Sequence, residues 1–243
     1  MEKSTSILHV FFYLPLLYNG NKKLTGMGFM LLLATFAAAS FFVSVFLNYI
    51  MCQLYRKTQL LVNTQEVVPW SHKKRKVALF SALFPFYYLS YFFSPDWQAF
   101  LPTGVLITFM VLVSIMDFEQ QIILDWVLLF PLLFALLLSG FFSVSLLDRL
   151  YAAFIGGSIM LILAILTKGG IGGGDIKLIF VIGLWLGLDS LLLTLAAGFL
   201  SGGLSAALLL MCRMKKLKDT IAYGPYFALW AIIAHVLQKS TVL

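Results

Sequence analysis

Long apolar runs separated by short polar stretches occupy the chain from residue 28 onward. The runs are continuous rather than alternating, which favours membrane helices over the strands of a membrane β-barrel. A helix needs about 20 apolar residues to cross a membrane. The pattern therefore predicts about eight transmembrane helices, at Gly28–Met51, Val77–Phe93, Ala99–Met116, Trp126–Phe142, Arg149–Thr167, Ile176–Leu188, Ser190–Cys212 and Ile221–Gln238.

Composition supports this prediction. Of the 243 residues, 61% are hydrophobic and 11% are charged. Soluble globular chains have about 45–50% apolar and about 25% charged residues. These proportions exclude a soluble globular domain and a disordered chain. The expected fold class is an all-α, polytopic integral membrane protein without a large soluble domain.

The N-terminal region differs from the rest. In residues 1–27 an apolar stretch, Ile7–Leu17, is interrupted by Pro15, and no small-residue cleavage site follows. We expect residues 1–27 to form an interfacial or re-entrant segment. Residues 28–98 are expected to hold the first helices, joined by a short basic loop at 52–76.

The positive charges are unevenly distributed. The net charge is +7, and twelve of the 17 Lys and Arg residues fall on the side that holds the loops 52–76, 117–125, 168–175 and 213–220. The positive-inside rule makes this side cytoplasmic. The basic run His72–Lys76 is expected to stop a helix at anionic lipid headgroups. Nucleic acid is not an expected partner, because its binding needs a basic face on a soluble fold.

Two carboxylates carry the candidate chemistry. Asp117 closes an apolar run, and Asp175 follows the segment 169–174, in which five of six residues are glycine. Asp175 also fits a helix N-cap. Two aspartates at one membrane face suggest an acid/base pair that shares a proton and activates water, as in aspartic proteases. Cys52 and Cys212 belong to no ligand cluster, so we expect no metal and no cofactor.

Three segments carry a resemblance to a known family. Ile115–Asp125 resembles the first active-site motif of type IV prepilin peptidases, in which an Asp that ends a helix is followed eight residues later by a second Asp. Gly172–Leu178 resembles the second motif, Gly-x-Gly-Asp followed by a hydrophobic residue and Lys. Tyr223–Tyr226 resembles the aromatic-Gly-Pro-aromatic segment near the last helix. The resemblance covers roughly residues 99–238, which it makes the peptidase membrane core.

The resemblance implies an activity and a site. Asp117 and Asp175 match the catalytic pair of enzymes that remove the basic leader of type IV pilin-like precursors, after a glycine, at the cytoplasmic face of the plasma membrane. Glu119 and Asp125 could attract the basic leader, and Lys177 could tune Asp175 or contact headgroups. The other expected supporting residues, which would allow an extended leader to approach or complete the last motif, are Gly172, Gly173, Gly174, Gly224 and Pro225.

The N-terminal half departs from the family pattern. Many members carry two zinc-binding Cys-x-x-Cys pairs, whereas residues 52–76 contain only Cys52. The motif that marks the methylating region has only faint echoes at 39–42 and 46–48, so N-methyltransferase activity is not expected. Leu124 replaces the usual proline before the second Asp. This reduced form is most similar to the peptidases of competence-pilus systems.

Two alternatives remain open at this point. The first is another Gly-x-Gly-Asp membrane protease of the preflagellin or presenilin-like type, although presenilin-like enzymes usually have Tyr where this chain has Met116. The second is a small ion- or proton-coupled transporter, which would also use aspartates and glycine-interrupted helices. Cleavage near a cytoplasmic leader would separate the prepilin type from both.

Overall fold

The computed structural model describes residues 26–61, 71–93, 97–168, 170–213 and 222–240. These residues form α-helices and one short 3₁₀ turn, and the described part contains no strand. The elements in order are α2 (Gly26–Leu61), α3 (His72–Phe93), α4 (Trp97–Gln120), α5 (Asp125–Leu137), η1 (Ser139–Phe141), α6 (Leu146–Leu166), α7 (Gly173–Leu186), α8 (Leu188–Met211) and α9 (Gly224–Ser240).

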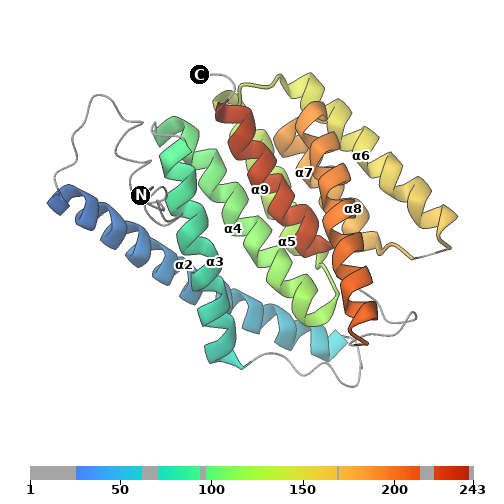
Figure 1. Cartoon of the computed structure of the whole chain (residues 1–243), viewed down its shortest axis with the longest axis horizontal. Coiled ribbons are helices and arrows are strands. Elements are labelled where there is room, and N and C mark those ends of the chain that lie inside the picture. The colour runs from blue at the N-terminus through green and yellow to red at the C-terminus, as the bar shows by residue number, and fades with distance from the viewer. Residues whose placement is uncertain (1–25, 62–70, 94–96, 169, 214–221, 241–243) are drawn as a thin grey trace, which may run out of the picture.

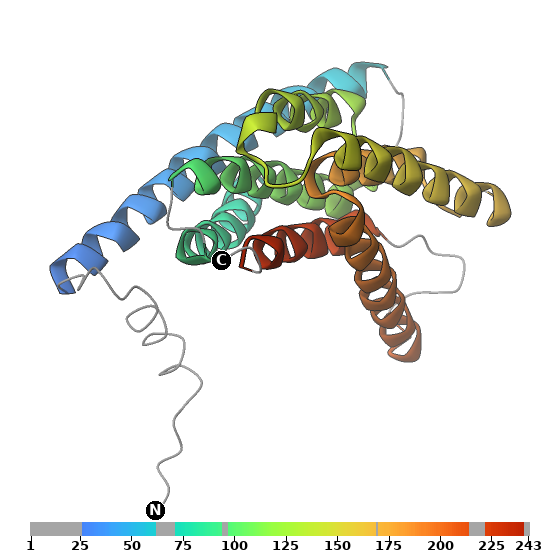
Figure 2. The same cartoon turned by 90° about the horizontal axis from the view of Figure 1, so that it is seen from above.

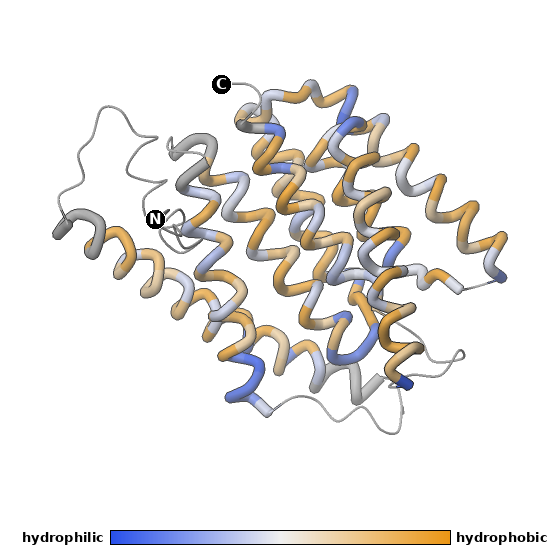
Figure 3. Tube along the Cα trace, in the orientation of Figure 1, coloured by the Kyte–Doolittle hydropathy of each residue, from blue (hydrophilic) through white to orange (hydrophobic). Residues whose placement is uncertain are grey.

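The helices form a bundle with polar ends. Four of them are long and apolar enough to cross a membrane, in the segments Leu31–Tyr55, Phe100–Gln120, Leu146–Leu166 and Leu188–Met211. Figure 3 shows apolar positions along the helices and hydrophilic segments collected at their two ends. The expected fold class, an all-α membrane protein, is confirmed.

Two local expectations differ from the structure. Much of the expected loop 52–76 is helical, because α2 continues to Leu61 and α3 begins at His72. The continuation of α2 buries Tyr55, which an exposed loop would leave in water. Asp175 is not the N-cap of α7, since Gly172 has that position. The segment expected at residues 1–27 lies almost wholly outside the described residues.

Small residues bring α6 and α7 close together. A Cβ atom built on Gly183 would lie only 2.7–2.8 Å from backbone atoms of Ala152 and Ala153. One turn after Ala152 in α6, a Cβ atom on Gly156 would lie 2.7 Å from a methyl group of Leu191 in α8. Such close approach supplies the van der Waals contact that holds helices together in lipid.

The start of α6 fixes one end of the bundle. Arg149 is fully buried, and its guanidinium donates hydrogen bonds to the carbonyl of Leu184 at 2.6 Å and to the carbonyl of Ala135. Both carbonyls belong to the last turns of their helices, α7 and α5, where no helical N–H is left to pair with them. Beside it, Asp148 Oδ2 accepts the N–H of Leu188 at 3.1 Å and caps α8.

Candidate active site

Asp117 is a buried residue in the last turn of α4. Its Oδ2 accepts a hydrogen bond of 2.8 Å from the backbone N–H of Gly224, the first residue of α9. Only glycine fits there, because an added Cβ would lie 2.6 Å from the same oxygen. The N-terminus of α9 thus presents an N–H and the positive end of a helix dipole to the carboxylate.

Two glycines of α8 let α9 come this close. A Cβ atom on Gly202 would lie 2.7 Å from the ring of Tyr223, and one on Gly198 would overlap the ring of Phe227. The two glycines lie one helical turn apart and share a face of α8. They leave room for the aromatic side chains on either side of Gly224, so they help to place its N–H against Asp117.

Asp175 lies in the first turn of α7, three residues after the N-cap Gly172. Its Oδ1 is buried and has no hydrogen-bond partner among the described residues. Burial raises the pKa of Asp175 to about 6, the nearby Asp117 carboxylate adds to this effect, and the Gly172 backbone acts in the opposite direction. The two aspartates therefore have different surroundings, which is how an acid and a base are distinguished in a pair.

A cavity of about 440 Å³ joins the two carboxylates. Asp117 and Asp175 both line it, from helices that are far apart in sequence. Thr167, Tyr223 and Phe227 are among the other residues of its wall. Both carboxylates thus border one space that is large enough to hold water.

The remaining predicted residues lie around the first turns of α5, α7 and α9. Lys177 Nζ contacts Asp125 Oδ1 at 2.6 Å, and both side chains are mostly exposed, so the pair adds little stability. Leu124, in place of the family's proline, has a φ of −74°, close to the value that proline imposes. Pro225 occupies the first turn of α9, where its missing N–H costs nothing.

The glycines of the second motif differ in what surrounds them. Gly172 is exposed, and a Cβ on Gly173 would meet nothing within 4 Å. Gly174 is tighter, since its Cβ would lie 3.0 Å from the side chain of Ile123. Gly174 is thus the position at which α7 approaches the segment between α4 and α5.

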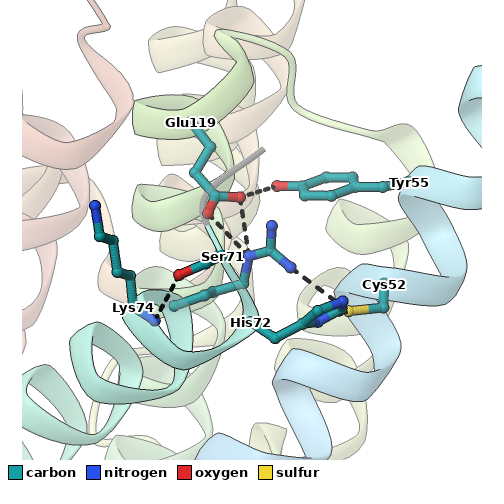
Figure 4. Close-up of polar contacts among 7 residues, drawn as sticks. Cys52, Tyr55, Ser71, His72, Lys74 and Glu119 are labelled. Carbon is teal, nitrogen blue, oxygen red and sulfur yellow. Dashed lines mark hydrogen bonds and ion pairs between the residues drawn. The ribbon is translucent and has the colours of Figure 1, made fainter. Parts of the chain in front are cut away.

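Glu119 lies elsewhere. Its carboxylate is completely hidden from solvent and pairs with the Arg75 guanidinium at 2.9 Å (Figure 4). It does not line the cavity, and an expected role in attracting a basic leader has no support in this position. Arg75 is the residue that the sequence analysis missed, because the basic run around it gave no sign that one member turns inward.

No metal site emerges from the part of the chain that the structure describes. There, no three His, Cys, Asp or Glu side chains gather at a spacing suited to a metal ion. The cysteines Cys52 and Cys212 form no disulfide.

Comparison with known proteins assigns the segment that bears both aspartates. Residues 104–207 match the type IV leader peptidase family. This segment belongs to that family. The segment contains Asp117 and Asp175 with the motifs around them, whereas α2, α3 and α9 lie outside it.

Several curated relatives share this region. The chain is 32% identical over 146 residues to a prepilin leader peptidase/N-methyltransferase of Bacillus subtilis, covering 58% of this chain and 57% of that protein. It is 33% identical over 155 residues to the protein of that name from Pseudomonas aeruginosa, covering 60% and 52%. The alignments thus span little more than half the length of these relatives. No solved structure matches the chain significantly.

Proposed function

We propose that this protein is a membrane-embedded aspartic endopeptidase that removes the leader of type IV pilin-like precursors. The observation that carries the proposal is the shared cavity, which is lined by the buried Asp117 of α4 and the half-buried Asp175 of α7. The family that residues 104–207 match and the names of the relatives supply the substrate class. The excess of Lys and Arg on the loops near both aspartates supports a cytoplasmic site.

The different surroundings of the two aspartates suggest their roles. Asp117 receives the N–H of Gly224, which stabilises its ionised form, so Asp117 acts as the base. Burial raises the pKa of Asp175 to about 6, so Asp175 carries the shared proton and donates it to the oxygen of the scissile carbonyl. Asp117 takes a proton from water, and the water oxygen attacks the carbonyl carbon. When the C–N bond breaks, the leaving nitrogen takes that proton from Asp117, and the diol returns its proton to Asp175.

The experiment is a cleavage assay in cells. The protein is expressed together with the pilin-like precursors of its own genome, and leader loss is followed by mass spectrometry. We expect cleavage after a leader glycine, and we expect both Asp117→Asn and Asp175→Asn to abolish it at unchanged protein level. Full cleavage by either variant would refute the proposed pair. A cut within the apolar helix of the precursor would instead favour a presenilin-like activity.

The same spectra test methylation. The relatives are named as methyltransferases as well as peptidases, whereas residues 52–76 lack the cysteine pairs of many members. We expect a product with an unmodified N-terminus. A cleaved product whose mass is higher by one methyl group would overturn that expectation.

A further inference from the structure

Three helices meet at Glu119, two residues after Asp117. The Arg75 Nε of α3 lies 2.9 Å from Oε1 and 3.0 Å from Oε2 of Glu119. From α2, the Tyr55 hydroxyl donates to Oε2 at 3.0 Å. Figure 4 shows the Tyr55 hydroxyl directed at the carboxylate. The ion pair is closed to solvent, since the side chains of Arg75 and Glu119 are 2% and 0% exposed.

Arg75 is itself held from other sides. Its guanidinium carbon lies 5.0 Å from the centre of the Tyr55 ring, and Nη1 donates to the sulfur of Cys52 at 3.5 Å. His72 Nδ1 lies 3.0 Å from the same sulfur. Two nitrogens of the guanidinium, Nε and Nη1, are therefore fixed in direction at once, which suits a guanidinium better than an ammonium group.

Stability alone does not account for such a pair. Taking two charges out of water costs about as much as their attraction returns, and apolar side chains of similar size often hold helices together at least as well. A buried ion pair does fix the position of its partners, because only one arrangement satisfies both charges.

The last turn of α4 carries both Glu119 and Asp117. Terminal turns lack part of their hydrogen bonding and fray readily. Here Gln121 leaves the helix with a φ of +53°, and its N–H closes the turn on the carbonyl of Asp117 at 2.9 Å. The Asp117 carboxylate must also meet the N–H of Gly224 at 2.8 Å. A small displacement of this turn would break that contact.

We propose that Arg75 and Tyr55 are positioning residues that fix Asp117 through Glu119. The inference rests on the proposed peptidase activity. It gives α2 and α3, which lie outside the segment that matches the family, a part in placing the catalytic base. Arg75 and Tyr55 touch neither the cavity nor the reacting atoms, so their effect is on the geometry of Asp117 alone.

The double variant Arg75→Met/Glu119→Leu separates positioning from stability. It removes both charges and keeps an apolar contact between α3 and α4. We expect an unchanged or raised melting temperature in detergent, a KM near that of the wild type, and a kcat lowered between about 10-fold and 100-fold, the range for a displaced catalytic group. Tyr55→Phe, which loses one donor to Glu119, should lower kcat by a smaller factor. Lys73→Met, on the exposed side of the same turn of α3, is the matched control.

A second variant guards against loss of the fold. Arg75→Lys keeps the charge and loses the fork, so we expect a stable protein with reduced kcat and unchanged KM. If both the double variant and Arg75→Lys fold and retain the wild-type kcat, the pair is only structural and the inference is wrong. Failure of the proposed function would look different, because wild-type protein would then leave every pilin-like precursor intact.

Discussion

Single carboxylates decide the pH behaviour of the proposed enzyme. Asp175 must be protonated to donate to the scissile carbonyl, and burial together with Asp117 raises its pKa to about 6. A raised carboxyl pKa means that the proton is present below this value and is lost as the pH rises through it. We therefore expect kcat/KM on a precursor peptide to decline on the alkaline side of about pH 6, by up to about tenfold per pH unit.

The measurement is a pH profile of the purified enzyme with the melting temperature recorded at each pH. Because the two aspartates interact, the alkaline limb of this profile, where the rate declines, reports the titration of the pair rather than of one residue. Asp189→Asn, at an exposed carboxylate in the first turn of α8, should leave the limb in place. A rate that increases steadily from pH 5 to pH 8 would contradict the proton-donor role of Asp175.

At the scale of helices, Arg149 joins elements that the membrane alone would not align. Its guanidinium serves the last carbonyls of α5 and α7, and it lies 3.8 Å from the centre of the Phe142 ring. We expect Arg149→Met to lower the free energy of unfolding by about 2 kcal/mol, the size of a hydrogen bond to a charged group. The free energy of unfolding of Arg149→Lys should lie between those of the wild type and Arg149→Met, because an ammonium group cannot reach two carbonyls in a fixed fork.

Melting in detergent, followed by loss of monomeric protein, tests this expectation. Arg213→Met, at an exposed position two residues after the end of α8, is the control and should melt at the same temperature as the wild type. If Arg149→Met melted at the same temperature as that control, the guanidinium would not hold the helix ends together.

The arrangement of helices also shows what the sequence could and could not predict. The fold class and both aspartates follow from local signals, namely the lengths of the apolar runs and the glycine-rich segment before Asp175. Arg149 and Arg75 look like ordinary cations at the ends of helices in the sequence. Their burial depends on partners 14 to 44 residues away, at Ala135, Leu184 and Glu119. No local pattern encodes such contacts, because they exist only once the helices have packed.

The whole molecule offers a route to the aspartates. Helices α6 and α8 touch near their first halves, where Gly156 faces Leu191, and then diverge in both views (Figures 1 and 2). The cavity lies in this wedge, since Met160 and Leu163 of α6 and Phe199 of α8 line it. The apolar helix of a precursor must reach a site bounded by such helices from the lipid side. The wedge is therefore the entrance expected for the proposed substrate.

A large side chain at Gly203 would narrow the wedge between α6 and α8. This residue follows Phe199 by one helical turn on the same face of α8, and a Cβ atom there would meet nothing within 4 Å. Gly203→Trp fills open space without displacing the core. We expect it to slow cleavage of a full-length precursor by at least about tenfold, the effect of about 1.4 kcal/mol in binding. A short soluble peptide that spans only the leader junction should be cut as by the wild type.

The comparison of the two substrates makes the result decisive. Leu208→Trp places the same side chain on the side of α8 opposite Phe199, where Leu208 is 52% exposed, and should affect neither substrate. Equal loss on precursor and peptide in Gly203→Trp would mean that the tryptophan disturbs the aspartates rather than the entrance. Unchanged cleavage of both would mean that the precursor helix enters elsewhere. Selective loss on the precursor alone is the outcome expected of a site that water reaches from one side and the substrate helix reaches through the wedge.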